Sequence, residues 1–131
     1  MALNLQGIHH LALRCQGVEQ FNKAITFYTA LLGLPLVRTW MSGENHCAMV
    51  DTGAGMLELF SNGTGMAGDI FPHLAFKTDN TDHCIQTVRA AGYEIIMEPK
   101  DIVIGSTPPY PARIGFCRGP AGEELEFFQE L

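Results

Sequence analysis

The chain has 131 residues, of which 47% are hydrophobic and 17% are charged, a composition that predicts one globular domain and excludes a disordered or fibrous protein. Eight basic against fourteen acidic residues give a formal net charge of −6, which argues against nucleic-acid binding because that function needs a concentrated basic face. No apolar run approaches the roughly 18–20 residues that a membrane-spanning helix requires.

The N-terminal segment, residues 1–7, lacks the basic region and apolar stretch that mark a secretory signal, so we expect a cytoplasmic protein. Its cysteines are scattered and form no CxxC pair, which argues against a zinc knuckle or a thioredoxin-like motif. In a reducing compartment we expect all four to be free, buried thiols. They are Cys15, Cys47, Cys84 and Cys117.

The pattern of the first half predicts a strand, a helix and three further strands. The opening segment around His10 is short and apolar and ends at a polar turn, as a strand does. Apolar residues from Val18 to Leu32 then recur at helical spacing, and Gly33 supplies the stop. Extended segments are predicted at residues 36–40, 47–50 and 56–60, with a Gly-rich turn at 53–55 before the last one.

The second half repeats this order after a Gly-rich linker, residues 63–70. A strand begins at His73, and Asn80 or Thr81 caps a helix that ends at Gly92. The apolar face of this helix consists of Cys84, Ile85, Val88 and Ala91. Strands are predicted at residues 93–97, 113–117 and 124–128, with a turn at 119–122, and residues 100–111 are predicted to be an irregular loop because they contain three prolines.

Two short sequence matches relate the halves to each other. Residues 10–15, His-Leu-Ala-Leu-Arg-Cys, resemble residues 73–78, His-Leu-Ala-Phe-Lys-Thr. Residues 56–60 and 124–128 both carry a Leu-Glu pair followed by two apolar residues. Each half therefore begins with a His-bearing strand and ends with a Glu-bearing one.

Side chains on a strand alternate between its two faces, and this alternation sorts the repeated residues. In the opening strand, His10 shares a face with Arg14, whereas His9 falls on the more apolar face, which would pack beneath the helix. The other His and Glu residues likewise lie opposite the most apolar face of their strands. The sequence therefore predicts a concavity of the sheet that carries His10, Glu58, His73 and Glu126.

Two imidazoles and two carboxylates at one point form a ligand set for a divalent transition metal, with open positions for substrate oxygens. The alternative at each position is a structural His or a solvated Glu. The same residue types at the same places in both halves favour the metal site, since a duplicated fold does not by itself require duplicated His and Glu.

At these residues the sequence resembles the vicinal oxygen chelate superfamily, and within it glyoxalase I. The likeness runs from Ile8 to about Gln129. It implies an α+β fold, one domain over residues 1–131 in which two βαβββ modules, residues 7–62 and 71–129, form curved mixed sheets around one metal. It assigns the metal ligands to His10, Glu58, His73 and Glu126. His9 competes with His10 for the first place, but only His10, like His73, is followed by Leu-Ala.

The resemblance also implies a reaction and its participants. The hemithioacetal of a 2-oxoaldehyde and a thiol would be isomerised to a 2-hydroxyacyl thioester, with Glu126 as the base. A divalent metal, zinc or nickel, would hold two substrate oxygens, and glutathione or another thiol would be the co-substrate. Arg14 and Asn62 stand where the family binds glutathione. A homodimer whose sites each use both chains is implied as well.

Other functions remain open because the turn at 119–122 and the segment 100–111 depart from the glyoxalase I pattern. One is another metalloenzyme of the superfamily: an epimerase, which usually has Gln in place of Glu58, or a dioxygenase or thiol transferase, which uses two His and one Glu. Another is a metal-free small-molecule-binding protein of the resistance type, which generally lacks the ligands. The complete set of four favours the glyoxalase I-like reaction.

Overall fold

The computed structural model describes residues 3–31, 33–66, 69–118 and 124–131. Strand, helix and three strands follow one another twice, so the predicted α+β fold of βαβββ repeats is confirmed. In chain order the elements are β1 (Leu5–Arg14), α1 (Gly17–Thr26), the π-helix η1 (Phe27–Leu31), β2 (Leu36–Ser42), β3 (Asn45–Asp51), β4 (Met56–Phe60), β5 (Leu74–Thr78), α2 (Thr81–Ala90), β6 (Ile95–Ile104), β7 (Tyr110–Arg118) and β8 (Glu124–Glu130). Within the described ranges, no helix has the length and apolar character needed to cross a membrane.

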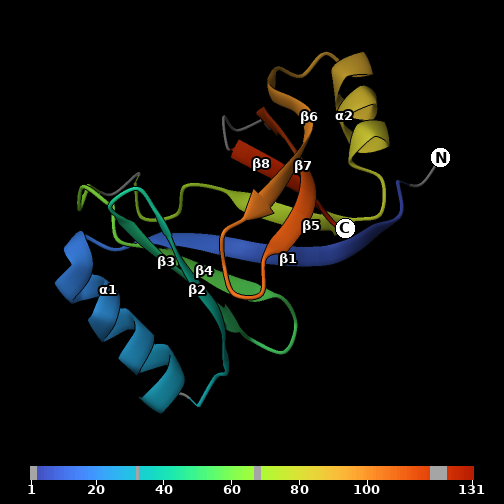
Figure 1. Ribbon diagram of the computed structural model, residues 1–131. Helices are drawn as coiled ribbons and strands as arrows, with labels where there is room; N and C mark the ends of the chain where they lie inside the picture. Colours follow the sequence, from blue (N-terminus) through green and yellow to red (C-terminus); the bar gives the residue numbers. More distant parts are fainter. Residues whose placement is uncertain (1–2, 32, 67–68, 119–123) are drawn as a thin grey trace.

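The eight strands form one curled sheet in the order β2-β3-β4-β1-β5-β8-β7-β6. β1 pairs parallel with β4, β5 pairs parallel with β8, and β1 and β5 run antiparallel at the centre. In Figure 1 the long β1 crosses the middle of the molecule, with α1 beside β3 and β4 and α2 beside β6, β7 and β8. The strand that contains His10 is therefore the neighbour of the strand that contains Glu58, and the strand that directly follows His73 is the neighbour of the strand that contains Glu126.

Each helix packs on the apolar face that strand alternation predicts. In the first half the buried Phe21 of α1 belongs to one cluster with Leu57 and Leu59 of β4, and Leu11 and Leu13 of β1 pack against it. In the second half the corresponding cluster consists of Cys84, Ile85, Cys117 and Phe127. All four cysteines are buried, as expected.

The segment 100–111 was predicted to be a loop, and this prediction is wrong. β6 extends to Ile104 and β7 begins at Tyr110, so only residues 105–109 connect the two strands. Of the three prolines that suggested a loop, Pro108 and Pro109 lie in this connection, and Pro111 lies near the start of β7, where a proline is tolerated and pairs with Val103. The predicted turn at 119–122 and the helical position Leu32 lie outside the described residues.

The predicted orientation of His9 is also wrong. β1 contains a register shift, since Ile8 pairs with Phe76 and His10 with Ala75, which leaves His9 as the extra residue. Such a bulge interrupts the alternation of side chains. As a result the rings of His9 and His10 both contact Phe128, on the face opposite the helices, with centroid distances of 3.9 and 5.3 Å.

Candidate metal centre

Four side chains from both halves of one chain meet where β1, β4, β5 and β8 lie side by side. Nε2 of His10 is 3.1 Å from Nε2 of His73, which directly precedes β5. Oε1 of Glu126 lies 3.0 and 3.3 Å from these two nitrogens, and Oε1 of Glu58 lies 3.3 and 3.6 Å from them. The structure thus brings together all four predicted ligands without the second chain that the resemblance implied.

The register of the sheet explains this meeting. Ala12 of β1 pairs with Glu58 of β4, and Ala75 of β5 pairs with Glu126 of β8. Each Glu therefore lies across from the residue two positions after the His of its own half, on the same face of the sheet. The alanines are small and fully buried, which leaves room above them for the imidazoles and carboxylates.

Burial and neighbouring charges act in opposite directions on the pKa values of His73 and Glu126. His10, Glu58 and Glu126 are buried, and the side chain of His73 is 13% exposed. Burial alone would lower the pKa of His73, but the carboxylates of Glu126 and Glu58 outweigh burial and raise this pKa to about 9. For Glu126, burial acts to raise the pKa, and the two imidazoles outweigh it and lower the pKa.

The donor set fits a divalent transition metal. His10, His73 and Glu126 each offer a ligand atom, and these atoms lie within 4.8 Å of one another, as the ligands of one ion bound at about 2.0–2.2 Å must. Oε1 of Glu126 is buried and accepts no hydrogen bond of ordinary geometry, although two imidazole nitrogens lie close to it. A cation between these atoms would satisfy the lone pairs that they direct toward one another.

The four predicted ligands line a cavity of about 220 Å³. Its other lining residues are Trp40, Ser42, Asn45, Cys47, Phe60, Ile102, Ile104 and Phe128. Sequence reasoning did not name them as site residues. Alternation on the predicted strands could have found Trp40 and Phe60, whereas Ile102 and Ile104 were hidden by the incorrect loop prediction. Mainly apolar walls around a polar centre suit a small molecule held by a few polar atoms.

Cys47 is the nucleophilic side chain in this cavity, but it is poorly suited to act as a thiolate. Burial, with a smaller contribution from the charge of Glu58, raises the pKa of Cys47 to about 12. A thiol that stays protonated at neutral pH is neither an efficient nucleophile nor a ready metal ligand. This agrees with the expectation that the cysteine is a core residue.

The two predicted substrate-binding residues do not line the cavity. Arg14 lies at the end of β1, and its Nη1 contacts Oδ1 of Asp69 at 2.9 Å. Asn62 is exposed and forms an isolated bridge with Gln16. Arg14 of β1 pairs with Phe60 of β4, and Phe60 lines the cavity. The side chain of Arg14 therefore begins on the strand next to a residue of the cavity wall.

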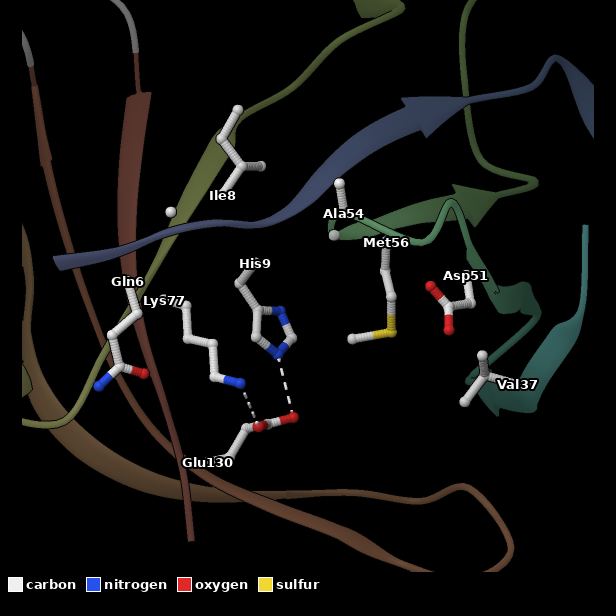
Figure 2. Close-up of a pocket in the computed structure, with 11 residues that line it drawn as sticks. Gln6, Ile8, His9, Val37, Asp51, Ala54, Met56, Lys77 and Glu130 are labelled. Atoms are coloured by element: carbon white, nitrogen blue, oxygen red, sulfur yellow. Dashed lines mark hydrogen bonds and ion pairs between the residues drawn. The ribbon is translucent and has the colours of Figure 1, made fainter.

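A second set of contacts, which the sequence did not reveal, lies directly behind His10. Nδ1 of His9 is 2.7 Å from Nδ1 of His10, and Nε2 of His9 is 2.7 Å from the hydroxyl of Tyr110 and 3.3 Å from Oε1 of Glu130. Burial, together with the neighbouring His10, lowers the pKa of His9 to about 4, so the ring is neutral at neutral pH. Figure 2 shows His9 and Lys77 converging on Glu130 at a pocket of about 580 Å³.

Comparison with known proteins gives a consistent family assignment. Residues 7–127 match the model of the Glyoxalase/Bleomycin resistance protein/Dioxygenase superfamily. A probable lactoylglutathione lyase of Vibrio cholerae is 30% identical over 132 residues, covering 93% of this chain and 89% of that protein.

Solved structures share the fold at lower sequence identity. Methylmalonyl-CoA epimerase from Mycobacterium tuberculosis superposes with a TM-score of 0.74 at 18% identity, covering 100% of this chain and 93% of that one. The Mn(II)-bound glyoxalase from Novosphingobium aromaticivorans superposes with a TM-score of 0.67 at 17% identity, covering 96% of this chain and 39% of that one.

Proposed function

Since this chain belongs to the Glyoxalase/Bleomycin resistance protein/Dioxygenase superfamily, we propose that it is a glyoxalase I-like, metal-dependent lyase. The proposed reaction converts the hemithioacetal of a 2-oxoaldehyde and a thiol into a 2-hydroxyacyl thioester. The observation that carries this proposal is the meeting of two imidazoles and two carboxylates in one small cavity. The similarity to the probable lactoylglutathione lyase of Vibrio cholerae supports the same reaction.

In this proposal His10, Glu58, His73 and Glu126 hold a divalent metal, zinc or nickel. The bound ion would supply positive charge beside two adjacent oxygens of the substrate. Glu126 is the proposed base, which takes a proton from one carbon of the substrate and returns it to the next. Its burial in a largely apolar cavity keeps water away from that carboxylate while it carries the proton.

Arg14 and Asn62 are proposed to bind the thiol co-substrate, glutathione or another thiol. A carboxylate of that molecule would replace Asp69 as the partner of Arg14. The predicted cytoplasmic location and homodimer stay predictions. The oligomeric state can be checked by light scattering on the purified protein.

A second candidate is a superfamily metalloenzyme with two His and one Glu as ligands. The specific observation in its favour is that ligand atoms of His10, His73 and Glu126 form the compact group, while Glu58 lies outside it. Against it, Oε1 of Glu58 is within 3.6 Å of both imidazole nitrogens and is buried with them. We therefore retain the four-ligand site as the main proposal.

The proposed function is tested by metal analysis followed by a turnover assay. After reconstitution with zinc, nickel, cobalt or manganese, we expect about one metal ion per chain by elemental analysis. With methylglyoxal and glutathione we expect formation of the thioester to depend on the metal. Consistent absence of metal would favour the metal-free binding protein, and metal uptake without turnover with any thiol would favour the second candidate.

A further inference from the structure

We propose that His9 and Glu130 are positioning residues that fix the tautomer of His10 and thereby raise the affinity of the site for its metal. The inference rests on the proposed metal site but not on the proposed reaction. The inference comes from the contacts that His9 makes behind His10. Neither the sequence repeat nor the resemblance to the family gives these contacts a role.

The first step concerns the hydrogen on Nε2 of His9. The hydroxyl of Tyr110 donates its hydrogen to Oε1 of Glu130, so the Tyr110 oxygen has only lone pairs left to offer to His9. The carboxylate of Glu130 is itself an acceptor. Both partners of Nε2 of His9, at 2.7 and 3.3 Å, are therefore acceptors, and this nitrogen carries the hydrogen.

The second step passes from His9 to His10. Since Nε2 of the buried His9 ring faces two acceptors and carries the hydrogen, Nδ1 of this ring is left as the acceptor, and it lies 2.7 Å from Nδ1 of His10. At that distance Nδ1 of His10 must carry a hydrogen and donate it. The ring's lone pair then sits on Nε2, the nitrogen that faces His73 and Glu126.

This is the tautomer that a metal ligand needs. If His9 instead donated from Nδ1, the lone pair of His10 would turn away from the ligand cluster, and Nε2 could not bind a cation. An outer partner that fixes the tautomer of a metal-binding imidazole also makes the imidazole a stronger ligand. Oε1 of Glu126 lies 3.0 Å from Nε2 of His10, so a lone pair on that nitrogen faces the other atoms of the ligand cluster.

The surroundings hold this arrangement in place. The ring of His9 is 3% exposed and stacks on Phe128 with a centroid distance of 3.9 Å. Nζ of Lys77 lies 3.3 Å from Oε2 of Glu130 and holds the second oxygen of that carboxylate, as Figure 2 shows. Both nitrogens of His9 are thus engaged away from the ligand cluster, which excludes His9 as a metal ligand in this arrangement.

The test compares three variants at positions 9 and 130. His9→Phe keeps an aromatic ring for stacking but removes the acceptor, and we expect metal affinity to fall about 10–100-fold in a competition assay with a chromogenic chelator. His9→Gln keeps an oxygen that can accept from His10, and we expect a smaller loss. Glu130→Gln weakens the outer partner of His9 and is expected to give the smallest loss. His83→Gln, which removes a His from α2, serves as the matched control with unchanged affinity.

A second measurement keeps the inference independent of the reaction and of metal uptake. Nitrogen NMR of the imidazole rings in metal-free protein should show His10 with its hydrogen on Nδ1 in the wild type and a mixture of tautomers in His9→Phe. Wild-type His10 with its hydrogen on Nε2, or a folded His9→Phe with wild-type affinity and tautomer, would overturn the proposal. Metal binding with these shifts but without lyase turnover would reject only the proposed reaction.

Discussion

The two halves of the chain each bring one His and one Glu, the proposed ligands, to the centre but surround them differently. His10, from the first half, is buried, and its Nδ1 contacts a second imidazole. His73, from the second half, is partly exposed and meets the ring of Phe116 edge-on, and no hydrogen bond to its Nδ1 is found in the described part of the chain. Strand register therefore determines where the proposed ligands lie, whereas neighbours that are not repeated in the other half determine how each ring is oriented.

The helices of the two halves also occupy equivalent places but differ in their polar contacts. The N-cap of α1, Gln16, makes no capping hydrogen bond with its side chain. In α2, Asn80 accepts a hydrogen bond from the backbone of His83, and Thr81 bonds the backbone oxygen of Arg113. The same fold thus carries one helix attached mainly by apolar contacts and one that is also fixed by polar contacts.

The largest expected effect concerns the two carboxylates of the site. Glu126→Gln removes the proposed base, so we expect kcat to fall by about 10²–10⁴-fold while the fold is retained. Glu58→Gln, the matched change in the first half, should mainly weaken metal binding and keep most of kcat when metal is saturating. Turnover and metal content of both variants check this, and unchanged turnover of Glu126→Gln would exclude its role as the base.

An intermediate effect is expected at the helix caps. Asn80→Ala removes a capping hydrogen bond and should lower the free energy of unfolding by about 1 kcal/mol in urea titrations. Gln16→Ala removes a side chain that makes no capping hydrogen bond, and it should change the free energy of unfolding by less than about 0.5 kcal/mol. Equal losses for the two variants would show that the capping contact does not distinguish the helices.

The smallest expected effect depends on pH. The guanidinium of Arg113, whose Nε and Nη2 lie 2.6 and 2.9 Å from the Asp82 carboxylate, holds the pKa of Asp82 below its ordinary value. A carboxyl group with a lowered pKa stabilises the folded state above its unfolded pKa, and this contribution is lost as the pH falls through the folded pKa.

Asp82→Asn should therefore be slightly less stable than the wild type at pH 7, and the difference should shrink as the pH drops below about 4. In the first half, Glu19 and Lys23 form an exposed pair at 3.5 Å, and Glu19→Gln should leave the urea midpoint unchanged at any pH. If Asp82→Asn is still less stable than the wild type at low pH, the loss of stability does not come from the ion pair between Asp82 and Arg113.

Much of the site could be predicted because it follows from local periodicity. The halves match at His10 and His73 and at Glu58 and Glu126, and alternation places these residues on corresponding faces of their strands. The predicted contributions of Arg14 and Asn62 came from resemblance alone, and the structure places neither in the cavity. Their proposed role depends on a partner molecule that would compete with Asp69, which no property of the strands reveals.

The sequence by itself determined the order of the elements, the apolar faces beneath the helices and the shared face of His10, Glu58, His73 and Glu126, because the alternation of side chains is a property of each strand's own backbone. Only the tertiary structure decided that β6 continues through Pro99, that His9 turns toward His10, and that one chain assembles the whole cluster. Those features depend on hydrogen bonds between strands distant in sequence, which no local pattern encodes.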